Sequence, residues 1–297
     1  MKAVVTGGAG FIGSNLVDAL VARGDEVVVI DDLSCGKHQH VNPSATLLER
    51  DIRDGVDLGE AELVFHLAAQ ADVSTSIARP VHDASVNVLG TVEILEAARR
   101  VGAKVVFTST GGAIYGECDG PASEESPCRP LSPYGIAKYC AEQYLEGWNR
   151  IHGTHHTTVR LANVYGPRQD SSLEGGVVAI FFERLAGGEP TVIYGDGLQT
   201  RDFVYVGDVV SALLAAVGAD GGVFNVGTGI ETTVLALHSA CAAIAGSQSP
   251  PRLAEARLGD VRRSVLNVAR ASHGLGWSAA TTLEVGLQES WDWFNAP

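Results

Sequence analysis

Basic residues are scarce in this sequence, and their scarcity excludes several kinds of partner. The 297 residues include 21 lysines and arginines against 35 aspartates and glutamates, which gives a formal net charge of −14. A nucleic-acid surface or an anionic membrane needs a basic face on its partner, so we expect neither. The deficit still permits a local basic pocket for a phosphorylated ligand.

Long hydrophobic runs are also missing. No stretch is long and apolar enough to span a bilayer, and the first apolar strand starts at Lys2, which leaves no room for a signal peptide before it. We therefore expect no membrane association and a cytoplasmic location.

Cysteines are few, odd in number and scattered. None of the five forms a CxxC pair; they are Cys35, Cys118, Cys128, Cys140 and Cys241. This pattern favours free thiols in a reducing compartment, and it predicts no metal site.

The first fourteen residues, MKAVVTGGAGFIGS, have the pattern of a buried strand, a glycine turn and a helix start. Gly7 permits the tight turn, Gly10 lets backbone N–H groups approach a pyrophosphate, and Gly13 lets the helix pack on the strand. The helix N-terminus offers unpaired N–H donors to the phosphates. A second apolar strand, residues 27–30, ends at Asp31, where a dinucleotide site needs an acid for the ribose hydroxyls.

Short apolar segments alternate with helical ones through the first half of the chain. The expected strands are residues 2–6, 27–30, 46–48, 63–67, 103–107 and 155–161, and residues 80–101 and 133–151 have helical patterns. The alternation predicts an α/β fold, a Rossmann-type doubly wound parallel sheet with helices on both faces. The ligand should lie beyond the carboxyl ends of the strands.

Two interwoven parts are expected. Residues 1–165 should form mainly the dinucleotide-binding domain, and residues 166–297 mainly a smaller α/β substrate lobe, with some of its strands and helices returning to the first domain. His66, at the end of one strand, is expected to be a packed histidine and not a catalytic one.

A tyrosine and a lysine share one face of the helix that begins near residue 133. Tyr134 and Lys138 are four residues apart, and Ser132 is placed to cap the helix. An ammonium beside a phenol stabilises the phenolate, so we expect a lowered pKa for Tyr134. Such a tyrosine can accept a proton from a sugar hydroxyl near neutral pH. The hydroxyl-rich segment 108–110 leaves the neighbouring strand at its carboxyl end.

The glycine motif, Tyr134-x-x-x-Lys138 and the segment TRDF at residues 200–203 together resemble the extended short-chain dehydrogenase/reductase family. The similarity covers essentially the whole chain and is closest to the nucleotide-sugar 4-epimerases typified by UDP-glucose 4-epimerase. It implies tightly bound NAD, a UDP-sugar substrate and a homodimer assembled through a four-helix bundle.

The resemblance also implies roles for individual residues. Residues of the NAD site would be Gly7, Gly10, Phe11, Ile12, Gly13, Asp31, Asp51, Ile52, Leu67, Ala68, Ala69, Tyr134 and Lys138. The catalytic group would be Thr110, Tyr134 and Lys138, and the UDP-sugar would contact Thr110, Asn163, Val178, Arg201, Arg257, Asp260 and Ser264. Asp31 would also disfavour the extra phosphate of NADP.

Two departures from related patterns bear on the reaction. The 4,6-dehydratase branch carries an Asp-Glu pair directly after its Ser/Thr, whereas this chain has Gly111 and Gly112 there, so dehydration lacks an acid and a base. The segment from Thr110 to Tyr115 is also one residue longer than the commonest form of this motif in the epimerases that the chain resembles.

The reaction implied is epimerisation at C4, in which the hydride passes to NAD⁺, the 4-keto sugar rotates, and the hydride returns to the opposite face. UDP-glucose/UDP-galactose is the expected pair. The small Ser264 would tolerate an N-acetyl group, which keeps UDP-N-acetylhexosamine open. UDP-glucuronate is the other alternative, and its carboxylate would need a partner such as Arg168, which could equally anchor its own loop. An NAD(P)H-dependent nucleotide-sugar reductase and a non-catalytic NAD-binding regulator also remain open.

Overall fold

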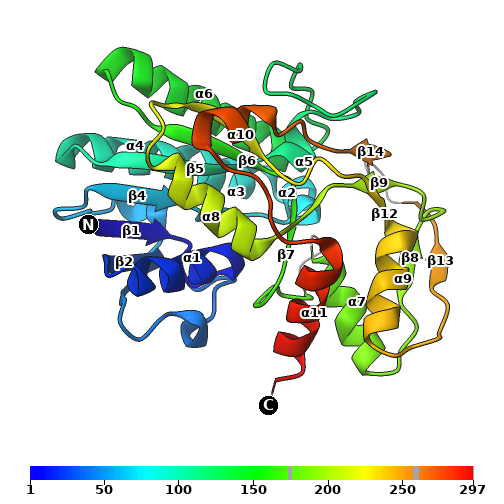
Figure 1. The fold of residues 1–297 in the computed structure, drawn as a ribbon. Coiled ribbons are helices and arrows are strands. Elements are labelled where there is room, and N and C mark those ends of the chain that lie inside the picture. The colour runs from blue at the N-terminus through cyan, green and yellow to red at the C-terminus, as the bar shows by residue number, and fades with distance from the viewer. Residues whose placement is uncertain (173–175, 257–260, 297) are drawn as a thin grey trace.

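A seven-stranded parallel sheet forms the centre of the computed structural model, which describes residues 1–172, 176–256 and 261–296 (Figure 1). The strand order is β11-β6-β5-β4-β1-β2-β3. The strands are β1 Lys2–Thr6, β2 Glu26–Asp31, β3 Thr46–Glu49, β4 Leu63–His66, β5 Lys104–Thr110, β6 Thr157–Leu161 and β11 Gly222–Val226. Val5 of β1 is aligned with Val29 of β2 and Phe65 of β4, and all three are fully buried. Burial on both faces explains why these strands are continuous apolar runs.

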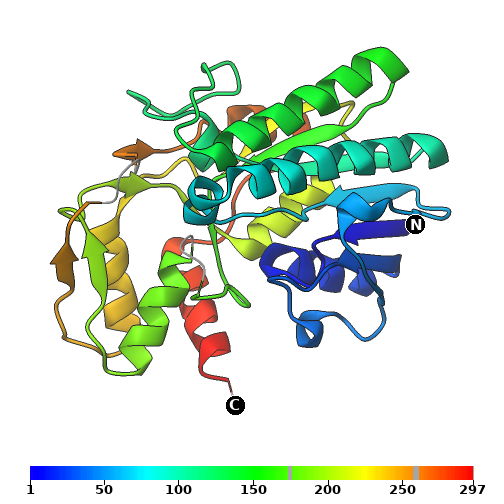
Figure 2. The same ribbon diagram turned by 180° about the vertical axis from the view of Figure 1, so that it is seen from behind.

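Helices cover both faces of this sheet (Figures 1 and 2). One face carries α1 Phe11–Ala22, α8 Val206–Ala216 and α10 Ala269–Leu275; the other carries α3 Pro80–Ala84, η3 Ser85–Leu89, α4 Gly90–Val101 and α6 Pro133–His152. Short elements connect the strands: η1 His38–His40, η2 Ile52–Asp54, α2 Val73–Ala78 and α5 Gly111–Ile114. The doubly wound fold predicted from the sequence is confirmed.

The helical segment 80–101 differs from the uninterrupted α-helix that its periodicity predicts. It is continuous, but its middle, η3, is a π-helix. Asn87 in this segment donates from Nδ2 to the carbonyl of Gln70 over 2.9 Å and accepts from the Gln70 N–H at Oδ1 over 3.0 Å. The wider π turn thus coincides with a side chain that is bonded twice to the loop after β4, a contact that periodicity does not report.

The second half of the chain contributes to both parts of the molecule. Its segments β11, α8 and α10 lie on the central sheet, whereas the remaining ones form a lobe beside the carboxyl ends of the strands (Figure 1). The lobe comprises β7 Asn163–Tyr165, α7 Val177–Ala186, β8 Val192–Tyr194, β9 Thr200–Arg201, β10 Phe203–Tyr205, β12 Thr232–Thr233, α9 Val234–Ile244, β13 Arg252–Ala254, β14 Arg263–Ser264 and α11 Leu283–Phe294. Its own core is built around Phe181, Phe182, Leu237 and Leu287. No helix in the described part of the chain is both long and apolar enough to cross a membrane.

Candidate active site

The turn between β1 and α1 can be built only with glycine. Gly7 has a φ of 71°, and a Cβ added there would lie 2.7 Å from Ala68 N. A Cβ on Gly13 would lie 2.1 Å from the Gly7 oxygen. Gly10 is the N-cap of α1, and no side chain caps the helix. The turn therefore presents bare backbone N–H groups at a helix N-terminus, a cradle that fits the pyrophosphate of a dinucleotide.

Asp31 lies beside this turn, at the end of β2. It is buried, and its carboxylate accepts from Ala9 N and from Leu33 N, each over 2.9 Å. Burial raises the pKa of Asp31, and these two backbone donors oppose the rise. The side chain is thereby fixed where the sequence places a partner for the ribose hydroxyls.

The other residues expected at the cofactor lie around the same turn or at the next strand ends. Phe11 and Ile12 open α1, and the segment 67–69 (Leu67, Ala68, Ala69) follows β4, with Ala68 N bonded to Thr6 Oγ1 over 3.2 Å. Asp51 caps η2 and pairs with Arg53, and Ile52 is buried against Gly90. Their contacts with NAD remain predictions.

Thr110, Tyr134 and Lys138 come together at the carboxyl end of β5. The Thr110 side chain lies close enough to the Tyr134 hydroxyl to lower its pKa, which supports the assignment of Thr110 despite the extra residue after it. Lys138 is buried one helical turn further along α6, with Nζ 4.5 Å from the centre of the Phe107 ring. The helix itself is fixed by Ser132, whose Oγ accepts from Gly135 N over 3.2 Å.

The electrostatics of this group differ from the sequence prediction. Burial raises the pKa of Tyr134 to about 12, the negative charge of Asp83 adds to the rise, and the Thr110 hydrogen bond only partly offsets it. Burial also lowers the pKa of Lys138 to about 8. The prediction of a lowered Tyr134 pKa is therefore wrong for the chain by itself, because desolvation outweighs the other contributions.

His66 behaves as the expected packed histidine. Its Nδ1 lies 2.7 Å from Thr6 Oγ1 and its Nε2 lies 3.0 Å from Thr91 Oγ1, and the ring stacks on Phe107. Burial lowers the pKa of His66 to about 3, so the ring is neutral at physiological pH.

Gly112 lies among three of the predicted substrate residues. A Cβ built on Gly112 would lie 3.5 Å from Asn163 Oδ1, 3.9 Å from Thr110 Oγ1 and 4.0 Å from Ser264 Oγ. Asn163 Oδ1 is buried and has no hydrogen-bond partner among the described residues. A buried amide oxygen of this kind needs a donor, which a sugar hydroxyl or a nucleotide can supply.

Arg201 and Ser264 reach this region on neighbouring strands. β14 pairs with β9 so that Ser264 is directly opposite Arg201. The adjacent Asp202 is buried and accepts from Thr228 N over 2.8 Å and from Gly229 N over 3.0 Å, which fixes the backbone on which Arg201 is mounted. Arg257 and Asp260 lie outside the described residues.

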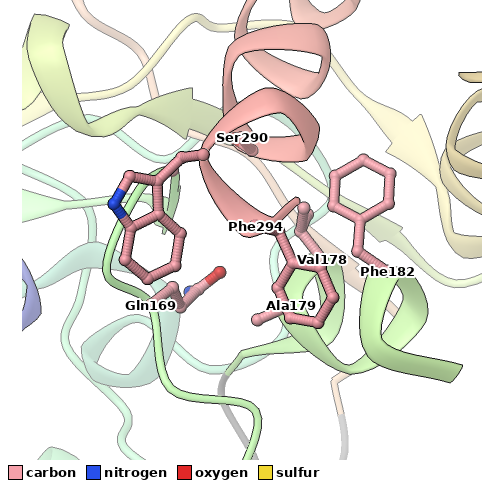
Figure 3. A pocket seen from close by; sticks show the side chains of 8 residues that line it. Gln169, Val178, Ala179, Phe182, Ser290 and Phe294 are labelled. Atoms are coloured by element: carbon pink, nitrogen blue, oxygen red, sulfur yellow. The ribbon is translucent and has the colours of Figure 1, made fainter. Parts of the chain in front are cut away.

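Val178 lies apart from the Thr110 group. It is buried and lines a cavity of about 10 Å³ between α7 and α11, together with Phe182, Ser290 and Phe294 (Figure 3). A space of this size holds about one water molecule. A place for Val178 in the nucleotide pocket remains a prediction.

Arg168 anchors its own loop. Its Nη2 lies 2.6 Å from Asp18 Oδ2 on α1, and the neighbouring Pro167 oxygen accepts from Asn15 over 3.2 Å. This pairing favours the anchoring alternative for Arg168 over a role as the partner of a uronate.

Three residues near the catalytic group were not anticipated from the sequence. Gln70, Asp83 and Asn87 form a hydrogen-bonded cluster beside α6, and each is separated from Tyr134 by more than forty residues. An acid on a polar-looking helix start carries no sequence signal of burial, so only the fold identifies Asp83.

A bare glycine turn next to a Thr–Tyr–Lys group defines a dinucleotide-dependent enzyme that works on a hydroxyl group. The NAD dependent epimerase/dehydratase family matches residues 3–227, and the chain belongs to that family. The UDP-glucose 4-epimerase of Mycolicibacterium smegmatis is 44% identical over 309 residues, with 99% of both chains covered.

Solved structures agree with this assignment. The UDP-glucose 4-epimerase of Thermotoga maritima with UDP-glucose matches at a TM-score of 0.97 and 46% identity, covering 99% of this chain and 98% of that one. The Thermus thermophilus UDP-glucose 4-epimerase in complex with NAD matches at a TM-score of 0.92 and 41% identity, covering 99% of each. The predicted family, fold class, NAD-dependent epimerase activity and NAD as cofactor are confirmed.

Proposed function

We propose that this chain is a UDP-sugar 4-epimerase that interconverts UDP-glucose and UDP-galactose. The observation that carries the proposal is the proximity of the Thr110 side chain to the Tyr134 hydroxyl, with the buried Lys138 one turn further along the same helix. The full-length relatives named UDP-glucose 4-epimerase support the choice of sugar.

Each residue of the group has a distinct task in this proposal. Bound NAD supplies an acceptor and donor of hydride at C4 and a positive ring charge. Tyr134 takes the proton of the 4-hydroxyl, and Thr110, beside the same phenol, passes that proton or orients the hydroxyl. Lys138 contributes a positive charge that stabilises the phenolate.

We place the hexose beside Gly112. Asn163 Oδ1 can accept from a ligand hydroxyl or amide, and the short Ser264 side chain leaves room beside it. We place the diphosphate near Arg201, opposite Ser264 on the neighbouring strand. With Gly111 and Gly112 after Thr110, the site lacks the acid pair that a dehydratase uses at these positions.

The proposal includes a homodimer in the cytoplasm. The helices α3–α4 and α6 lie side by side (Figure 2). Large apolar side chains are exposed on them, including Val81 (83% exposed) and Ile151 (72% exposed). A two-fold pairing of this face would cover them and form a four-helix bundle.

The test is a panel of UDP-sugars offered to wild type, Ser264→Tyr and the control Ser239→Tyr, whose site is exposed on α9. The expected result is C4 epimerisation of UDP-glucose, with N-acetylhexosamine as a side activity that Ser264→Tyr suppresses relative to the plain hexose. Turnover of UDP-glucuronate alone would contradict the choice of sugar. Steady consumption of added NADH would indicate a reductase, and NAD binding without turnover of any sugar would indicate a regulator.

A further inference from the structure

A buried carboxylate lies next to the catalytic helix and has no part in the proposed reaction steps. Asp83, the next-to-last residue of α3, is 1% exposed. Its Oδ1 accepts from Gln70 Nε2 and from Asn87 Nδ2, each over 2.9 Å. Burying a carboxylate lowers the stability of the fold unless the group is hydrogen-bonded or paired with a cation. The two amides supply hydrogen bonds to Asp83, and a nearby cation would stabilise its charge further.

The surrounding backbone holds this cluster rigidly. Gln70 is bonded at its N–H and carbonyl to the Asn87 amide, and its Oε1 accepts from Asp72 N over 2.8 Å. The carbonyl of Asn87 accepts from Thr91 Oγ1 over 2.7 Å. Both amide donors therefore point at Asp83 from fixed positions, and the π-helical η3 supplies one of them.

The cluster lies against the helix that carries the proposed base. α3 and η3 both pack on α6, and the charge of Asp83 acts on Tyr134 and on Lys138. Burial raises the pKa of Asp83, and the two amide donors and the nearby Lys138 ammonium oppose that rise and favour the ionised form.

We infer that Asp83 is a positioning residue whose buried carboxylate keeps Lys138 in its ammonium form and sets the pH range over which Tyr134 accepts a proton. This inference rests on the function proposed above. It assigns to the Gln70–Asp83–Asn87 cluster a role in adjusting the proton affinity of Tyr134, and it links the π-helical segment to that role through Asn87.

Other charged and titratable groups face the same residues. Lys138 is also approached by Glu142, one turn further along α6, and by the neutral ring of His66 on β4; Asp83 is approached by His82 on its own helix. Glu142 raises the pKa of Lys138 more than Asp83 does, although Glu142 is also held in a buried ion pair with Arg160 over 2.6 Å. The hydrogen bonds of Asp83 are instead to two neutral amides, which leave its charge free to act on Lys138.

The direction of the effect follows from the signs of the charges. A negative charge raises the pKa of both a phenol and an ammonium, and the pKa of each of these groups is raised by Asp83. Removal of the charge should therefore move both limbs of the kcat–pH profile to lower pH, by about one unit. A residue with only a structural role would lower kcat without moving either limb.

The experiment compares wild type with Asp83→Asn, which keeps the shape and an acceptor oxygen for both amides. The exposed Glu93→Gln on α4 is the control for a change of one charge. Asp83→Ser is a second uncharged variant, and it provides the test if Asp83→Asn does not fold. Wild type and Glu93→Gln should share one profile, and the Asp83 variants should be displaced to lower pH on both limbs.

A second readout does not depend on turnover. The ultraviolet absorbance of the Tyr134 phenolate can be titrated in NAD-bound, sugar-free protein as the difference from Tyr134→Phe, and its midpoint should fall by about one unit in Asp83→Asn. An unchanged midpoint and unchanged limbs, or a shift to higher pH, would overturn the inference. If wild type turns over no UDP-sugar, the proposed function fails while the phenolate titration still decides on Asp83.

Discussion

Tyr134 is the residue on which the proposed chemistry depends most directly. Tyr134→Phe removes one hydroxyl and leaves the ring, so the fold and the bound NAD should be retained. Epimerisation should fall by about 10²–10⁴-fold, since that is the usual contribution of a general base. Initial rates with UDP-galactose and the NAD content of the purified protein give the two readouts. Tyr194→Phe, at the exposed end of strand β8 in the lobe, should match wild type; comparable rates in both variants would refute the assignment of Tyr134.

The buried histidine His66 makes the fold sensitive to acid. Its pKa is about 3 in the folded chain against an ordinary value of 6.5, so between these limits only the unfolded chain takes up the proton. Stability is therefore lost as pH falls below about 6.5, and by pH 5 the loss amounts to about 2 kcal/mol. Urea unfolding measures the free energy of unfolding at pH 7 and at pH 5. Between these two pH values His66→Gln should lose less of this free energy than wild type does, by about the same amount. The control His152→Gln, at an exposed site, should lose as much free energy of unfolding as wild type between these pH values. A loss in His66→Gln equal to that of wild type would count against this account.

At the scale of elements, an ion pair fixes α6 against the central sheet. Arg160 of β6 and Glu142 of α6 are both buried, and Arg160 Nη1 also donates to the Tyr115 hydroxyl over 2.7 Å. Glu142 lies two turns beyond Tyr134, so this contact sets the rotation of the helix that carries the base.

Removing one partner of this ion pair should lower the free energy of unfolding much more than removing both. Arg160→Leu leaves a buried carboxylate without its cation and should lower the free energy of unfolding by about 3–5 kcal/mol. Adding Glu142→Leu should recover most of that loss. Arg150→Leu is the control, since its pair with Glu146 is exposed and contributes about 0–1 kcal/mol. Denaturant unfolding measures all three, and a small loss in Arg160→Leu would show that water reaches Glu142.

Local patterns in the sequence predict individual helices, strands and turns well. They predict poorly which side chains from distant segments come together in the folded chain. The glycine turn and the Tyr134–Lys138 spacing are local, because backbone sterics and helix geometry act over a few residues. The convergence of Gly112, Asn163 and Ser264 depends on the packing of distant segments, which no local pattern reports. The pKa of Tyr134 departs from its sequence prediction for the same reason, since desolvation exists only once the chain is packed.

At the scale of the whole molecule, the exposed apolar face of α3–α4 and α6 predicts a dimer. Leu89 and Tyr144 are 61% and 42% exposed on this face. Replacing both with glutamate should place like charges in a desolvated contact and yield a monomer. Leu253→Glu, on the exposed β13 of the lobe, should leave the mass unchanged. Sedimentation at micromolar concentration distinguishes these outcomes, and a wild type that sediments as a monomer would refute the dimer.

The π-helical segment has a consequence for how relatives of this chain can vary. A π turn accommodates one residue more than an α turn, so a single-residue deletion within 85–89 would restore a straight helix. The residues before the deletion would then rotate by about 100° relative to those after it. If α4 keeps its contacts with the sheet, Asp83 would then be turned away from its place beside α6 in one genetic step. We therefore expect insertions and deletions to spare this segment in any lineage that keeps the buried acid, and a relative with the shorter helix and the acid still buried against α6 would show otherwise.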